Sequence, residues 1–150
     1  MADIFFEDFE LGATFVSIAR TITEADIVHF ACLTGDFHPV HVDAEFAKKS
    51  IFKQRVAHGL LGITYAVGMI NNWDLRAKTN MAFLHFECNF LCPTKIGDTI
   101  HCKVTIAEKR EWKNAGKGVI VFAIELVNQR NEIVTEGKMH ELVFKRKTKA

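Results

Sequence analysis

Apolar and polar residues alternate through most of the second half of the chain, which is the two-residue period of a β-strand. Between residues 99 and 109, for example, Ile100, Cys102 and Val104 alternate with polar side chains. The pattern predicts strands at 81–92, 99–109, 118–127 and 132–146, an earlier strand at 14–18, and a hairpin turn at 128–131. Strands that follow one another so closely favour an antiparallel sheet.

The segment before these strands has helical signals instead. Thr23 opens an S/T-x-x-D/E pattern that is typical of a capped helix start, and Gly35 marks where that helix ends. Asp43 is placed to cap a second, short helix. The stretch between them, 36–42, carries Pro39 and is predicted to be a loop.

A third helix is predicted at 59–72, where apolar residues occur on almost every side. Such a helix is expected to be buried all round, so it needs other elements to cover it. The strands supply that cover. The order of elements therefore predicts an α+β domain in which a curved antiparallel sheet wraps around a central buried helix.

Composition limits the alternatives. The 150 residues are 49% hydrophobic and carry a formal charge of +1, which suits one globular domain over 1–150 and argues against nucleic acid as a partner. No apolar stretch reaches the length of about 18 residues that a transmembrane helix needs, so no membrane role is expected. The four cysteines form no CxxC pair, and the first residues do not resemble a signal peptide, so a cytoplasmic protein with reduced thiols is predicted.

The densest cluster of candidate chemistry is the segment Gly35-Asp36-Phe37-His38-Pro39-Val40-His41. A carboxylate and an imidazole on one short, proline-stiffened segment can face the same small volume, as paired acid and base catalysis requires. Two alternatives remain open. Asp36 and His41 could have only structural roles in a turn and at a helix entrance, or His38 and His41 could join Asp36 in binding zinc or iron(II).

A second candidate is the junction Ala57-His58-Gly59 at the start of the central helix. The first N–H groups of a helix have no partner within the helix and lie at the positive end of its dipole. An oxygen that gains negative charge would be stabilised there, and Gly59 would let a substrate come close to the backbone.

These motifs resemble a known family. The segment 35–41, followed after fifteen residues by Ala57-His58-Gly59-Leu60-Leu61, and the later Phe90-Leu91-Cys92-Pro93 and Gly97-Asp98-Thr99, are similar to the MaoC-like dehydratases and (R)-specific enoyl-CoA hydratases. The resemblance implies a hot dog fold and an assembly built from dimers. It also implies that coenzyme A or acyl carrier protein arrives as part of a thioester substrate, with no metal or redox cofactor.

The same resemblance assigns roles to individual residues. Asp36 and His41 would be the catalytic pair that activates water, and the N–H of Gly59 would bind the thioester oxygen. His38, Pro39 and His58 are expected to contact the substrate. The family usually has asparagine where this chain has His38.

Two other functions stay open on the same fold. A thioesterase would cleave the thioester instead of hydrating a double bond, and the spacing of Asp36 and His41 favours hydration over it. A non-catalytic acyl-CoA-binding protein would bind the same ligand without turnover, and the departure at His38 keeps that alternative open.

Overall fold

The computed structural model describes residues 3–73, 78–113 and 116–146, apart from the side chains of residues 72 and 73. In chain order the elements are η1 (Phe6–Asp8), β1 (Thr14–Val16), β2 (Arg20–Thr21), α1 (Glu24–Thr34), α2 (Pro39–Val42), α3 (Ala44–Lys49), α4 (Gly59–Trp73), β3 (Asn80–Phe90), β4 (Thr99–Glu111), β5 (Lys117–Asn128) and β6 (Ile133–Phe144).

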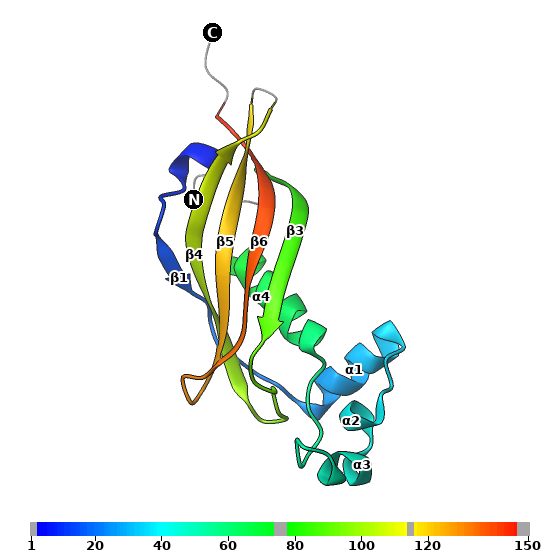
Figure 1. Ribbon diagram of the computed structural model, residues 1–150. Helices are drawn as coiled ribbons and strands as arrows, with labels where there is room; N and C mark the ends of the chain where they lie inside the picture. Colours follow the sequence, from blue (N-terminus) through cyan, green and yellow to red (C-terminus); the bar gives the residue numbers. More distant parts are fainter. Residues whose placement is uncertain (1–2, 74–77, 114–115, 147–150) are drawn as a thin grey trace.

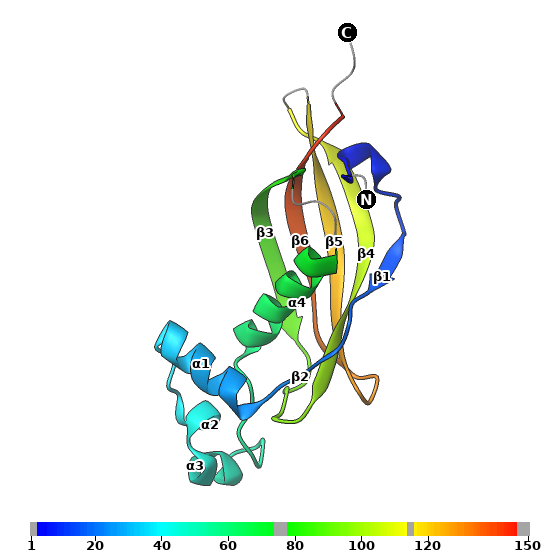
Figure 2. The same cartoon turned by 180° about the vertical axis from the view of Figure 1, so that it is seen from behind.

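The strands form one antiparallel sheet in the order β1-β4-β5-β6-β3, and β2 pairs with β4 beyond β1. The helix α4 lies against one face of this sheet, as both views show (Figures 1 and 2). The four long strands predicted from alternation are confirmed, with ends that move by at most two residues. The predicted strand at 14–18 is shorter than expected, because the pairing with β4 continues only to Val16.

A hydrophobic core fills the space between α4 and the sheet. The helix contributes Leu61, Ala66, Met69 and Ile70, and the sheet contributes alternate residues such as Ile100, Cys102, Val104 and Ile106 of β4. Because side chains of a strand alternate between its two faces, the residues between these point to the opposite, outer face of the sheet. The α+β arrangement expected from the sequence is therefore present.

The expectation that α4 would be buried all round is wrong for this chain on its own. Leu61 is buried, but the side chain of Leu60 is 60% exposed and Thr64 is also exposed. The sheet curves over one side of the helix and leaves the other side uncovered (Figure 2). An apolar sequence pattern predicts that a surface is buried, but it does not identify what covers that surface.

The short helices α1, α2 and α3 lie together at one end of the sheet, beside the start of α4 (Figure 1). The predicted cap of α1 is confirmed, since the Thr23 hydroxyl accepts a hydrogen bond from the backbone N–H of Asp26 and the Asp26 carboxylate accepts one from Thr23. Gly35 ends the helix in the left-handed conformation, with φ at 77°. Asp43 caps α3, also as predicted.

The segment 36–42 is not wholly a loop, which corrects the prediction. Its second half is the single-turn helix α2. Pro39 occupies the first helical position, where its fixed φ suits a helix and its missing N–H costs nothing. The ring of His38 caps the turn by accepting a hydrogen bond from the N–H of Val40 at 3.3 Å.

In the described part of the chain, no helix combines the length and the apolar character that crossing a bilayer demands.

Candidate active site

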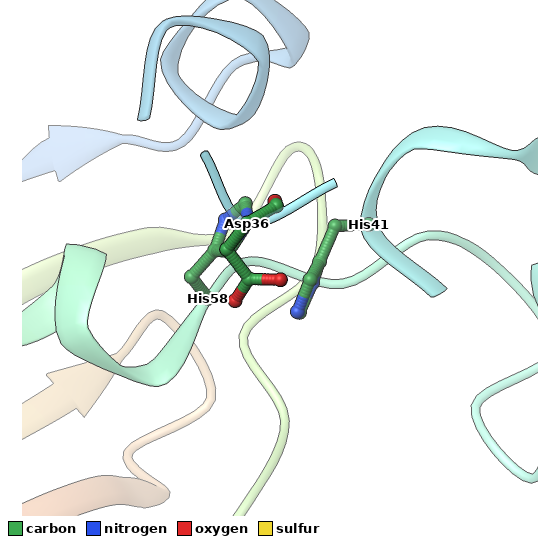
Figure 3. Close-up of side chains that lie close together, drawn as sticks. All are labelled: Asp36, His41 and His58. Carbon is green, nitrogen blue, oxygen red and sulfur yellow. The ribbon is translucent and has the colours of Figure 1, made fainter. Parts of the chain in front are cut away.

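Three side chains from two segments of the chain meet at the end of the sheet where α1 to α4 converge. Asp36 lies between α1 and α2, His41 lies on α2, and His58 immediately precedes α4. Figure 3 shows them gathered in one small volume, and one nitrogen or oxygen atom from each lies within 4.8 Å of the others. The structure therefore brings together Asp36 and His41, as the sequence predicted, and adds His58 to the pair.

His41 is oriented by the backbone. Its Nδ1 lies 2.8 Å from the carbonyl oxygen of Val56. A carbonyl oxygen can only accept, so Nδ1 carries the hydrogen and the other nitrogen, Nε2, has a free lone pair. Partial burial lowers the pKa of His41 below its ordinary value, and the nearby His58 lowers it further, against the opposing effects of the Val56 carbonyl and of Asp36. His41 is thus suited to accept a proton near neutral pH.

Asp36 is exposed and held by its own local turn. One carboxylate oxygen accepts a hydrogen bond from the N–H of His38 at 3.2 Å, and the backbone carbonyl of Asp36 accepts one from Nε2 of His58 at 2.9 Å. The carboxylate keeps further lone pairs for another donor, such as a water molecule.

Gly59 begins α4 beside these side chains. A Cβ atom at this position would lie 2.7 Å from the ring of Phe90, so only glycine fits without moving that ring. Within the described residues no acceptor receives the N–H of Gly59. This donor lies at the positive end of a fifteen-residue helix, where an anionic oxygen would be stabilised.

A cavity of about 520 Å³ opens next to this cluster. His41, His58 and Gly59 line it, together with Phe52, Leu60 and Phe90 and the segment from Leu91 to Thr94. Its walls are mainly apolar with a few polar groups, as is typical of small-molecule sites. Asp36, His38 and Pro39 do not belong to this lining, although Asp36 is in reach of His41.

Two further hollows, of about 590 and 620 Å³, lie on the outer face of the sheet. Charged side chains such as Lys103, Glu125 and Lys138 line the first, and Arg110, Glu111 and Lys113 lie at the second. Neither contains any of the site residues predicted from the sequence, so the cavity at α4 is the better candidate.

Comparison with known proteins identifies the family of the chain. A family model described as "MaoC like domain" matches residues 8–128. The chain belongs to this family. A protein named MaoC from Klebsiella aerogenes is 40% identical over 108 residues, which are 70% of this chain and 31% of that protein. An (R)-specific enoyl-CoA hydratase from Rhodospirillum rubrum is 33% identical over 102 residues, which are 68% of this chain and 69% of the relative.

Solved structures agree with this MaoC-like assignment. A monoamine oxidase regulatory protein from Archaeoglobus superposes with a TM-score of 0.93 at 37% identity, covering 97% of both chains. A Mycobacterium tuberculosis protein described as a double hot dog fold superposes with a TM-score of 0.81 at 14% identity, covering 99% of this chain and 46% of that one. The predicted family and the predicted hot dog fold are therefore confirmed. The chain spans only about a third of the Klebsiella relative.

The metal alternative is weakened by the geometry of this MaoC-like site. The ring of His38 is 6.1 Å from that of His41, and its Nδ1 is engaged with the Val40 N–H. The rings of His41 and His58 stack at 3.8 Å with 27° between their planes. Ring-nitrogen lone pairs lie in the ring plane, so two stacked imidazoles do not converge on one ion. The cluster suits proton transfer better than chelation.

Sequence reasoning missed the residues that act through their backbone. The Val56 carbonyl orients His41, and the Thr94 carbonyl holds the N–H of Ala57 at 2.8 Å. Neither contact has a signature in side-chain identity. Phe90, which packs against Gly59, and Cys92, which lines the cavity, lie in the Phe90-Leu91-Cys92-Pro93 segment that had drawn attention only as a family motif.

Proposed function

We propose that this chain is a hydratase or dehydratase that adds water to an enoyl thioester, or removes it from the 3-hydroxyacyl thioester. The observation that carries the proposal is that the Asp36 carboxylate lies beside the His41 imidazole, and that His41 lines the same cavity as Gly59, whose N–H is unpaired in the described structure. Acid-base groups and an oxyanion donor are the two things that this reaction needs.

The thioester carbonyl oxygen accepts a hydrogen bond from the N–H of Gly59. As a bond forms at C3, electrons of the C2–C3 double bond move toward this oxygen and give it enolate character. The N-terminus of α4 stabilises that charge without moving, because the donor is already in place. The Phe90 ring occupies the space that a side chain at position 59 would take, so glycine keeps this N–H beside the ring without a clash.

Asp36 and His41 hold the water between them. The free lone pair on Nε2 of His41 takes a proton from the water as its oxygen bonds to C3, and the Asp36 carboxylate accepts the second hydrogen of the water as a hydrogen bond. A proton then passes from the pair to C2, which completes the 3-hydroxyacyl thioester. The reverse sequence expels water, so the same residues serve both directions.

The carrier is coenzyme A or acyl carrier protein, bound only as part of the substrate, and the product is the (R)-3-hydroxyacyl thioester. The similarity to an (R)-specific enoyl-CoA hydratase supports this stereochemistry. His38 and Pro39 do not line the cavity, so any contact that they make with the substrate lies outside it.

The assembly is a homodimer or is built from homodimers. Among the described residues β3 pairs only with β6, so its eleven residues present an open strand edge. Phe83 and Phe90 on this strand are 50% and 54% exposed. A long open edge with apolar side chains is the feature through which sheets associate. Light scattering on the purified chain gives the mass directly.

The test is incubation with trans-2-enoyl-CoA substrates and chiral analysis of the products. A 3-hydroxyacyl-CoA of (R) configuration supports the proposal. Free thiol without hydroxylated product would instead identify a thioesterase.

A second candidate is an acyl-CoA-binding protein without turnover. It is favoured by the close superposition on a structure named as a regulatory protein. Thermal stabilisation by enoyl-CoA, with no product from any substrate, would identify that function.

A further inference from the structure

His58 is the buried member of the cluster, with only 4% of its surface exposed. It touches both proposed catalytic residues at once. Its Nε2 lies 2.9 Å from the backbone oxygen of Asp36, and its ring stacks on His41 at 3.8 Å. Phe30 of α1 covers another side, with ring centroids 5.0 Å apart. Although His58 is among the residues that line the cavity, so little exposure leaves a substrate only a small part of its surface to contact.

The hydrogen bonds define how the two rings carry their hydrogens. His58 donates from Nε2 to the Asp36 carbonyl, so in the neutral ring its Nδ1 is the acceptor. That Nδ1 is buried and has no partner in the described structure. His41 has the opposite arrangement, with Nδ1 as the donor and Nε2 as the acceptor.

We propose that His58 is a positioning residue for the reaction proposed above. Its hydrogen bond fixes the backbone of Asp36, and its stacked ring fixes the plane of His41, so that carboxylate and imidazole face the same water. The expected effect on kcat rests on the proposed function, whereas the tautomers and the titration of His41 can be tested without turnover.

The two contacts can be removed separately. The amide of glutamine can donate from a position close to that of Nε2, so His58→Gln keeps a donor for Asp36 and removes the ring. Phenylalanine keeps a flat ring against His41 and has no donor, so His58→Phe removes only the hydrogen bond. His29, an exposed residue of α1, provides the matched controls His29→Gln and His29→Phe.

Loss of the hydrogen bond from His58 to the Asp36 carbonyl should lower kcat. Without it the backbone of Asp36 can shift, and a misplacement of about 1 Å in a reacting group costs about 10²-fold in rate. We expect His58→Phe to lower kcat by about that factor while KM changes little, because the binding walls of the cavity remain.

Loss of the ring acts on His41. Burial is the main cause of its lowered pKa, and the stacked ring supplies part of that burial. The other titratable groups that face it are Asp36 and His38, and Cys92 lines the same cavity. We expect the pH midpoint of the His41 titration to rise toward its ordinary value in His58→Gln and to stay low in His58→Phe.

The experiment combines steady-state kinetics with nuclear magnetic resonance of the imidazole groups. Hydration of crotonyl-CoA gives kcat and KM for the wild type, both His58 variants and both controls. Titration of the imidazole signals gives the His41 midpoint in the same proteins. Imidazole nitrogen shifts of the wild type give the two tautomers and need no variant at all.

The proposal is supported if His58 carries its hydrogen on Nε2 and the two variants separate as described. It is overturned if His58 carries its hydrogen on Nδ1, or if folded variants keep both the kcat and the His41 midpoint of the wild type. A rise in KM alone would also overturn it, since it would make His58 a substrate contact. If the wild type hydrates nothing, the proposed function fails, and the tautomers and the His41 midpoint still decide whether His58 positions the pair.

Discussion

Nδ1 of His41 donates a hydrogen bond to the carbonyl oxygen of Val56, fifteen residues further along the chain. This single contact determines which nitrogen faces the cavity as a proton acceptor. It also connects α2 to the segment that leads into α4, so that the imidazole and the Gly59 N–H keep a fixed position relative to each other.

The first prediction concerns pH. His41 must be neutral to accept a proton from water, and its pKa is below the ordinary value of about 6.5. The acidic limb of the kcat/KM profile should therefore be centred below pH 6.5, as His41 becomes protonated. A pH profile measured at constant ionic strength checks this. An acidic limb centred above pH 6.5 would show that another group controls the rate.

The second prediction concerns Gly59. A methyl group there would meet the Phe90 ring at 2.7 Å, so Gly59→Ala should push that ring into the cavity and lower kcat/KM by about 10²-fold, the scale of an oxyanion donor displaced from its position. Shortening the neighbour in the double variant Gly59→Ala/Phe90→Leu should recover part of the loss. Equal losses in the single and double variants would mean that the ring is not the cause.

The third prediction concerns stability at the crossing of α1 and α4. Asp26 accepts hydrogen bonds from Tyr65 at 2.6 Å and from Arg20 at 2.7 Å. Burial alone would raise the pKa of Asp26, but these donors and Thr23 outweigh that effect and hold the pKa well below its usual range. Burial and the hydrogen bond to Asp26 raise the pKa of Tyr65 to about 12. The Asp26→Asn variant should lose about 1 to 3 kcal/mol of unfolding free energy at neutral pH.

The sign of the pH effect follows from the depressed pKa of Asp26. Its stabilisation is fully present above the pKa of about 3.9 in the unfolded chain and is lost as the pH falls below that value. The unfolding free energies of the wild type and Asp26→Asn, measured in urea, should therefore differ less in acid than at neutral pH. Asp43→Asn is the matched control, because asparagine caps a helix as well as aspartate. A constant gap at all pH values would contradict the assigned role of the charge.

The fourth prediction concerns the acyl group. In the described structure no lysine or arginine lines the cavity beside α4, and its walls include Phe52, Leu60 and Phe90. A carboxylated acyl chain would lose its hydration there without gaining a partner. Enoyl-CoA substrates with plain hydrocarbon chains should therefore have a higher kcat/KM than carboxylated ones of the same length. The reverse order would point to a cation supplied from elsewhere in the assembly.

Local signals predicted much of this molecule. Thr23 and Gly35 bound α1 because capping and the left-handed conformation are chemical preferences of the residues themselves. Alternation located the long strands because successive side chains of a strand point to opposite faces of the sheet. The helix α2 escaped prediction because one turn has no periodicity, and β2 escaped because two residues have no alternation.

The site was predictable only in part. Asp36 and His41 share a short segment, so the sequence could place them together. The stacking of His58 on His41 depends on how α4 meets α2, and the contact with Val56 is made by a backbone group. Long-range contacts of this kind follow from the fold as a whole.

The most direct test of the account is the loss of the enoyl-thioester absorbance of crotonyl-CoA when purified protein is added. We expect a fall in absorbance with the wild type and with the matched control Asp43→Asn, and rates about 10²- to 10⁴-fold lower with Asp36→Asn and with His41→Ala. Hydration that continues unchanged in folded Asp36→Asn and His41→Ala would contradict the central claim that this pair performs the chemistry.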